Sequence, residues 1–267
     1  MFSCPCLTKG VVWVDYLYDG TYEGLLCCVY AHYYVEKATG IFREGEYQTN
    51  MFGNVYRVKT NEDQAHRVYE AIGTKLGEFT LRRSYLAYLS CFSDKEMRLL
   101  RYLVLGFRTG QGFNNLHGHP DVFGVQEMEK RIYNERHRYF GILRFSVISA
   151  HGNSTGEPLR QVLYAAIEPD NDLLELLVEH FLDRYRSDPF IIHDVGREKA
   201  VFADDGQWYV APLSAGITTE LAQGEEFYRA MWKRYFDAIA IRERTNPRCQ
   251  KNFMPMKYWD HLTEKLL

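Results

Sequence analysis

Hydrophobic residues recur every three to four positions through most of the first half of the chain, whereas short β-branched and aromatic runs dominate the second half. The helical period predicts four helices before residue 110, at about Thr21–Glu36, Glu62–Leu76, Phe79–Phe92 and Asp94–Phe107. Two extended runs in the same half predict strands at Val11–Tyr18 and Asn54–Lys59.

The second half alternates strands with helices. Short apolar runs separated by turn residues predict five strands, at Phe145–Ala150, Val162–Ile167, Phe190–His193, Lys199–Ala203 and Trp208–Ala211. The first two read as a hairpin with its tip at His151–Pro158. Helices are expected at Asp170–Arg186, at Glu225–Ile241 and, briefly, from Lys257.

This segregation predicts an α+β protein, with a mostly antiparallel sheet in the second half and a helical first half packed on it. A boundary near residue 115 would divide it into an N-terminal strand plus helical region, 1–115, and an α+β region, 116–267. Alternatively, the first strand joins the second-half sheet and the chain forms one integrated domain.

We expect the chain to be organised around a central helix at Lys130–Phe145, whose apolar stripe contains an acid, Glu135. Arg131 and Arg138 lie one turn before and after it, so we expect Glu135 to be buried and paired with one of them. Two interpretations remain open. The helix either carries a structural ion pair or contributes to a buried polar site, in which Glu135 and His137 are candidates for catalytic acid and base.

The distribution of charge along the chain indicates which kind of partner it could bind. The 267 residues carry a net charge of −3, so any phosphate-binding face must be local. Residues 130–144 have five cations against one acid, and residues 229–257 have eight against two, with aromatics interleaved. Cations that can contact phosphates, beside rings that can stack bases, indicate nucleic-acid binding, and the alternative is a solvated helix face with a Trp or Tyr anchored in the core. The candidate DNA-binding residues are Arg131, Arg138, Arg144, Arg242, Arg244, Arg248, Lys251 and Trp259.

The sequence gives little support to other classes of protein. The chain has no signal-peptide pattern at its start and no run of about 18 apolar residues, so no membrane association is expected. Six Cys without framework spacing indicate a reducing, cytoplasmic setting, with Cys4 and Cys6 as thiols of a loose tail. Phosphate-loop and nucleophile-elbow motifs are missing, and His117, His119 and Asp121 have no further ligand cluster nearby. We therefore expect neither a cofactor nor a metal.

Several motifs occur in order along nearly the whole chain: Tyr18–Gly24, Glu135–Arg138 with Leu143–Phe145, Tyr164–Asp170, His180–Arg184, Ile191–Asp194, Arg242–Lys251 and Met254–Trp259. In this series the chain resembles the bacterial "probable DNA metabolism protein" family, a domain of unknown function. That family is found beside a radical-SAM protein similar to spore photoproduct lyase, and elsewhere fused to a uracil-DNA-glycosylase-like domain. The first ten residues and the longer hairpin tip at 151–158 depart from the family.

The resemblance implies a DNA repair or modification accessory protein, with DNA and a radical-SAM lyase-like protein as partners. Whether the chain is itself an enzyme stays open. One alternative is an enzyme acting on a base or nucleotide through Glu135 and His137. Its difficulty is that side chains two positions apart on a regular helix diverge by roughly 160°. The other alternative is a protein–protein scaffold without DNA contact.

Overall fold

The computed structural model describes residues 14–48, 54–150, 160–214 and 225–262. The chain forms two compact units, residues 1–131 and 132–267. The boundary between them falls inside a long helix, α5 (Pro120–Ile142), where the sequence does not have the composition of a linker. No helix in the described ranges is both long and apolar enough to cross a membrane.

Unit 1 contains a three-stranded parallel sheet of order β2-β1-β3. Its strands are β1 (Val14–Tyr18), β2 (Gly40–Arg43) and β3 (Asn54–Arg57). In the central strand, Tyr16 lies opposite Ile41 on one side and Tyr56 on the other. The idea that the first strand joins the second-half sheet is therefore wrong, because both edges of β1 are already hydrogen-bonded within unit 1.

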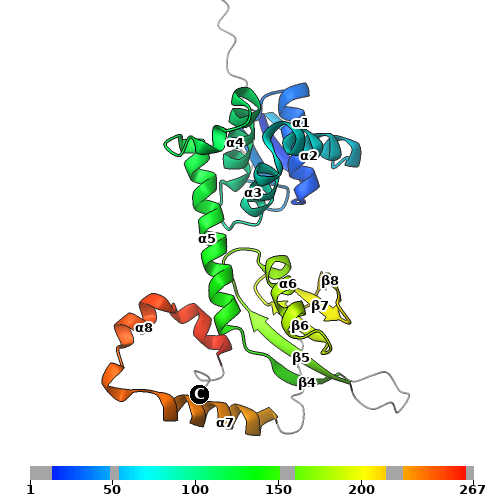
Figure 1. Ribbon diagram of the computed structural model, residues 1–267. Helices are drawn as coiled ribbons and strands as arrows, with labels where there is room; N and C mark the ends of the chain where they lie inside the picture. Colours follow the sequence, from blue (N-terminus) through cyan, green and yellow to red (C-terminus); the bar gives the residue numbers. More distant parts are fainter. Residues whose placement is uncertain (1–13, 49–53, 151–159, 215–224, 263–267) are drawn as a thin grey trace, which may run out of the picture. The chain divides into compact units, whose positions relative to one another are not determined.

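Helices cover this sheet (Figure 1). They are α1 (Tyr22–Tyr34), α2 (Glu62–Leu76), α3 (Glu78–Tyr88) and α4 (Lys95–Thr109), followed by a short 3-10 turn, η1 (Phe113–Asn115). The predicted helices are confirmed, and local capping explains two of their starts. The Thr21 hydroxyl accepts from the Gly24 amide at 2.9 Å, and the Asn61 side chain accepts from Gln64 at 2.9 Å.

Unit 2 is built on a five-stranded sheet of order β4-β5-β6-β7-β8. The strands are β4 (Ser146–Ala150), β5 (Arg160–Ile167), β6 (Phe190–Asp194), β7 (Lys199–Asp204) and β8 (Gln207–Pro212). All neighbouring pairs are antiparallel except β5 and β6, which the helix α6 (Leu174–Arg184) connects. The α+β class and the mostly antiparallel second-half sheet are confirmed, and the hairpin tip lies outside the described residues.

The end of unit 2 is a segment that we call the C-terminal arm, residues 225–262, drawn orange to red in Figure 1. It contains α7 (Glu225–Ile239), η2 (Arg242–Arg244), α8 (Pro247–Phe253) and η3 (Met256–His261). The basic connection after α7 is not one continuous helix, because exposed residues 245 and 246 separate η2 from α8. Pro247 opens α8, where a missing amide costs nothing, and the Asn246 side chain caps the helix by accepting from Cys249 at 3.0 Å.

Candidate functional site

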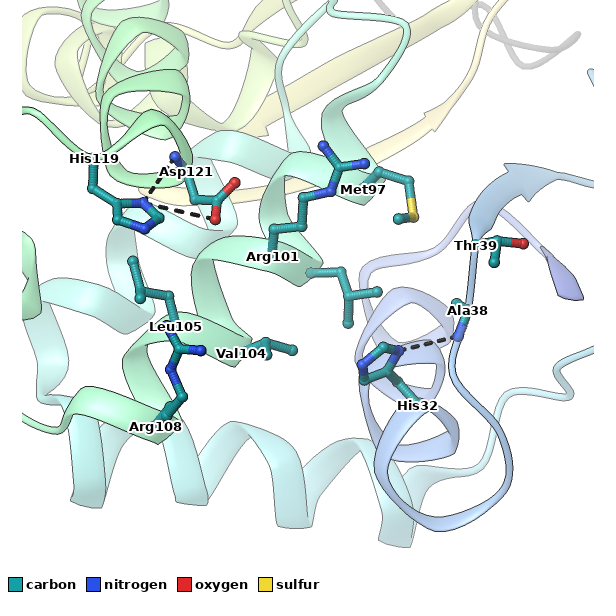
Figure 2. Close-up of a pocket in the computed structure, with 11 residues that line it drawn as sticks. His32, Ala38, Thr39, Met97, Arg101, Val104, Leu105, Arg108, His119 and Asp121 are labelled. Carbon is teal, nitrogen blue, oxygen red and sulfur yellow. Dashed lines mark hydrogen bonds and ion pairs between the residues drawn. The ribbon is translucent and has the colours of Figure 1, made fainter. Parts of the chain in front are cut away.

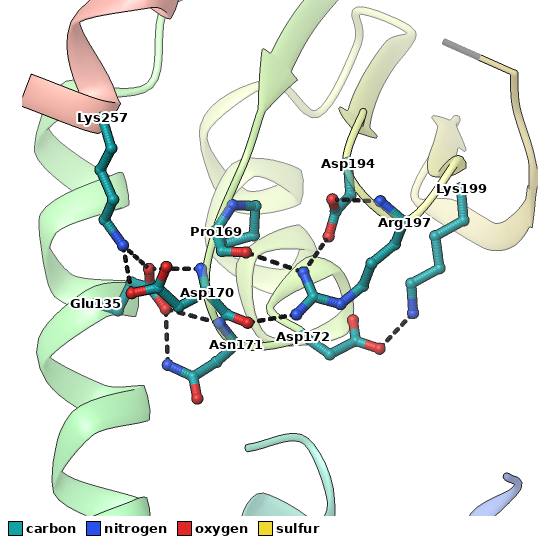
Figure 3. Close-up of polar contacts among 9 residues, drawn as sticks. All are labelled: Glu135, Pro169, Asp170, Asn171, Asp172, Asp194, Arg197, Lys199 and Lys257. Atoms are coloured by element: carbon teal, nitrogen blue, oxygen red, sulfur yellow. Dashed lines mark hydrogen bonds and ion pairs between the residues drawn. The ribbon is translucent and has the colours of Figure 1, made fainter. Parts of the chain in front are cut away.

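The best-defined polar cluster of unit 2 surrounds the carboxylate of Glu135, which is 3% exposed. Its Oε1 accepts hydrogen bonds from the Asp170 amide at 2.9 Å, from Lys257 Nζ at 3.1 Å and from the Tyr258 hydroxyl at 3.2 Å. Its Oε2 accepts from the amide and the side chain of Asn171, at 3.0 and 2.7 Å. Figure 3 shows how α5, the β5–α6 loop and η3 converge on this group.

The donors keep Glu135 ionised. Burial by itself would raise the pKa of this carboxyl, but the hydrogen bonds from Asn171 and Asp170 and the charge of Lys257 together hold it below its ordinary value of 4.5. Burial would likewise lower the pKa of Lys257, yet its contacts with Asp170 and Glu135 raise it overall. The cluster is thus a stable ion pair with its lone pairs occupied.

The expected burial of Glu135 is confirmed, but the expected partners are wrong. Arg131 pairs with Glu127, at 2.9 Å, and stacks over the Phe92 ring. Arg138 is exposed. The buried carboxylate is instead neutralised by a lysine from a distant segment, Lys257.

A second set of contacts holds the same loop from its other side. Arg197 donates to the Pro169 carbonyl at 3.0 Å and to the Asp170 carbonyl, and it pairs with Asp194 at 2.9 Å. Asp194 is fully buried, and burial raises its pKa although Arg197 opposes that rise. The β5–α6 loop is therefore clamped between α5 and the β6–β7 turn, which explains why α6 starts at Leu174, later than expected.

The geometry gives Glu135 a positioning role. A general base needs a free lone pair directed at its substrate, and both oxygens here already accept from protein donors. His137 is exposed, two positions along a helix that stays regular from Pro120 to Ile142. The two candidate catalytic residues therefore face different environments.

The C-terminal arm is attached at both ends through buried glutamates. At its start, Glu225 is 8% exposed and accepts from the Val147 amide of β4 at 3.2 Å. Arg229 pairs with Glu225 at 3.2 Å and donates to the Ser146 hydroxyl at 2.6 Å. At its end, Lys257 and Tyr258 reach Glu135. The sequence patterns did not mark Glu225 as an anchor, because its partners lie on a strand 78 positions earlier.

Between these anchors the arm exposes rings and cations. Of the predicted DNA-binding residues, Arg244, Arg248 and Lys251 are exposed on η2 and α8, and the side chain of Arg242 lies outside the described part. Trp259 is half-buried and donates to the Met254 carbonyl at 3.1 Å. The exposed aromatic side chains of the arm are Phe227, Tyr228, Trp232, Tyr235 and Phe253.

A groove of about 850 Å³ lies where α7 faces the end of α5 and α6. The guanidinium of Arg144, a predicted residue, lies 5.4 Å from the Trp232 ring centre. Arg184 lies 5.7 Å from the Tyr185 ring centre. Sequence reasoning missed Arg184 and Tyr185, because α6 has an ordinary amphipathic pattern and carries no basic cluster. The lining includes Phe140, Phe145, Tyr185, Tyr228, Trp232 and Tyr235.

The histidine-rich loop before α5 offers little to a metal. His119 Nδ1 lies 3.7 Å from Asp121 Oδ2 (Figure 2), whereas His117 contacts Gln126. Throughout the described ranges, no group of three or more His, Cys, Asp or Glu side chains is arranged to hold a metal ion. The absence of a metal stays a prediction.

Comparison with known proteins places the site within a family. Neither the curated proteins nor the solved structures gave a match to this chain. The sequence model of one family, described as a domain of unknown function, DUF4130, matches residues 93–264. The matched range holds α4, α5, the Glu135 cluster and the whole C-terminal arm. Because the match covers well over half of the sequence, the chain belongs to the DUF4130 family.

Proposed function

We propose that this protein is a DNA-binding accessory protein that holds DNA along its C-terminal arm for a radical-SAM lyase-type partner. The observation that carries the proposal is the arm itself, a segment anchored at both ends whose middle exposes cations beside aromatic rings. DNA repair or modification as the setting comes from the resemblance to the DNA metabolism family.

In this proposal the exposed cations of the C-terminal arm contact the phosphates of DNA. Arg244, Arg248 and Lys251 are exposed on η2 and α8, so their charges are accessible to phosphate groups. Exposed cations that contact phosphates release counterions, which makes binding strongly salt-dependent. The two anchors reduce the freedom of the arm before binding, and so less ordering entropy is lost when DNA binds.

The aromatic rings favour unpaired bases. Every base has a face that can stack, whereas bases inside a duplex are already stacked on one another. Tyr228, Trp232 and Tyr235 line the groove of about 850 Å³, which is large enough for more than one base. Arg144 beside Trp232 supplies a cation close to that stacking surface. We therefore propose single-stranded DNA, or a locally opened duplex, as the ligand.

Binding of labelled single- and double-stranded oligonucleotides, followed by fluorescence anisotropy across a salt series, tests this proposal. Replacing Arg244, Arg248 and Lys251 together by Glu should weaken binding and lower the salt slope by about one unit per cation removed. A matched control reverses the charge of Lys59, Lys75 and Arg82, which are exposed on unit 1. The proposal fails if the folded arm variant binds DNA as tightly as the parent does.

The partner is tested separately. The purified radical-SAM lyase-like protein encoded beside a family member should associate with this chain in anaerobic size-exclusion chromatography, in the presence or absence of DNA. DNA binding without association would retain the DNA-binding role and remove the partner. Association without any salt-dependent DNA binding would instead identify the protein as a scaffold, which the exposed rings of α7 would also suit.

A further inference from the structure

The sheet of unit 2 ends in an edge strand without the usual protection. β8 is the last strand of the order, and no strand lies beyond it among the residues that the structure describes. Its sequence, Gln-Trp-Tyr-Val-Ala-Pro, has no charged residue, and its register with β7 runs without a bulge. Trp208 is 38% exposed, Tyr209 62% and Val210 38%. Proteins commonly protect an edge with charges or bulges, because its amides and carbonyls can pair with another strand.

The register with β7 shows which backbone groups of β8 point away from the sheet. The Leu213 amide donates to the Glu198 carbonyl at 2.9 Å, so this opposing pair is hydrogen-bonded. Hydrogen-bonded and non-hydrogen-bonded pairs alternate along an antiparallel ladder. Counting back from Leu213, Tyr209 also bonds to β7, whereas the amide and carbonyl groups of Trp208 and Val210 point outward. Within the described ranges these outward groups have no hydrogen-bond partner.

We propose that β8 is a dimerisation edge, on which β8 of a second copy of this chain adds in antiparallel orientation. The two-fold axis passes between the two copies of Tyr209. Trp208 of each chain then lies opposite Val210 of the other, and each outward amide meets an outward carbonyl of the second copy. The strand is thus complementary to itself.

Neighbouring registers satisfy fewer of these groups. An axis at Val210 would place Trp208 opposite Pro212, which has no amide to donate. An axis at Trp208 would place Val210 opposite Gly206, which lies in the turn between β7 and β8 and has a φ of +75°. The axis at Tyr209 is therefore the register that uses all the outward groups of both residues.

The side chains fit the same register. Tyr209 lies opposite its own copy at a non-hydrogen-bonded position, where two strands approach most closely. Its ring already stacks on Phe202 of β7, with ring centres 5.3 Å apart and planes 14° apart. Pairing continues this row of rings across the axis. On the other face Trp208 meets Val210, and such aromatic and β-branched pairs stabilise antiparallel sheets.

Sedimentation velocity of the full chain over a concentration series tests the dimer. A single short strand pair buries little area, so we expect a reversible dimer with a dissociation constant on the order of 10–100 µM. Tyr209→Lys places like charges opposite each other and should weaken association by roughly tenfold or more. Val210→Pro removes an amide that β7 does not use and should act similarly. The control Tyr34→Lys, at a tyrosine that is 69% exposed on α1, should dimerise like the parent.

A mixture of two charge variants tests the position of the axis. Tyr209→Lys and Tyr209→Glu should each associate poorly alone, whereas their mixture should associate several-fold more tightly, because opposite charges then face each other. Urea unfolding shows whether each variant is folded, and the two Tyr209 variants decide if Val210→Pro is not. The proposal is refuted if the parent stays monomeric throughout the series, if folded Tyr209→Lys dimerises like the parent, or if the mixture gains nothing.

The same experiments separate this edge from other binding. A parent chain that stays monomeric, but binds the lyase-type partner in a way that Tyr209→Lys abolishes, would make β8 a partner edge and refute self-pairing. The arm variant with Arg244, Arg248 and Lys251 replaced by Glu should dimerise like the parent, since those residues lie on η2 and α8. The dimer and the DNA-binding role can thus fail independently.

Discussion

Lys257 donates a hydrogen bond to Glu135 across 3.1 Å, although 122 positions separate the two residues in the chain. The same ammonium group also contacts Asp170, in the β5–α6 loop. A buried carboxylate on α5 thereby holds the last turn of the C-terminal arm. The position of the proposed DNA-binding segment thus depends on a group in the interior.

Replacing Glu135 by Ala should destabilise the protein by about 3–5 kcal/mol, because the buried amides of Asp170 and Asn171 lose their acceptor and Lys257 its partner. Urea unfolding followed by tryptophan fluorescence measures this change. Glu127→Ala is the matched control, since it removes a surface ion pair with Arg131 and should cost less than about 1 kcal/mol. An E135A protein as stable as the parent would contradict the positioning role.

The Glu135 contribution should depend on pH. Its pKa lies below the ordinary 4.5, so the unfolded state binds this proton more readily than the folded state does. The stabilisation is complete above the unfolded pKa and is lost as the pH falls through the folded value. The difference in unfolding free energy between the parent and Glu135→Gln should therefore be constant above about pH 6 and should shrink toward pH 3. A constant difference over the whole range would show that the charge of Glu135 adds nothing.

Removing an exposed ring from the arm should weaken binding of single-stranded DNA more than binding of duplex. Phe253 is 79% exposed on α8, and its replacement by Ala should cost about 1–3 kcal/mol if one base stacks on it. Phe123→Ala, on α5 within unit 1, serves as the control because that ring is 59% exposed. Equal losses for both forms of DNA would rule out stacking as the role of Phe253.

The four described cysteines should differ sharply in reactivity. Cys27 and Cys28 are fully buried on α1, and burial raises the pKa of each thiol. Cys91 and Cys249 are exposed. Brief treatment of the folded protein with iodoacetamide, followed by peptide mass spectrometry, should label Cys91 and Cys249 and leave the α1 pair unmodified until urea is added. Labelling of Cys28 before unfolding would show that α1 opens in the native state.

Local sequence patterns were sufficient to predict most of the secondary structure. The helices α2, α3 and α4 follow from their apolar periods, because the side chains that share one face of a helix are only three or four positions apart. The burial of Glu135 follows from the same rule, since its neighbours in the stripe are Met128, Ile132 and Tyr139, all buried. The basic and aromatic composition of the arm is likewise visible in the sequence.

Partners distant in sequence were decided only by tertiary structure. Nothing local shows that Glu135 is bound by Lys257 and Tyr258, that Glu225 caps an amide of β4, or that β1 pairs within unit 1. A periodic pattern reports which side of an element is buried, because it depends on neighbours a few residues away. It carries no information about which distant element covers that side, and here that choice created the Glu135 cluster.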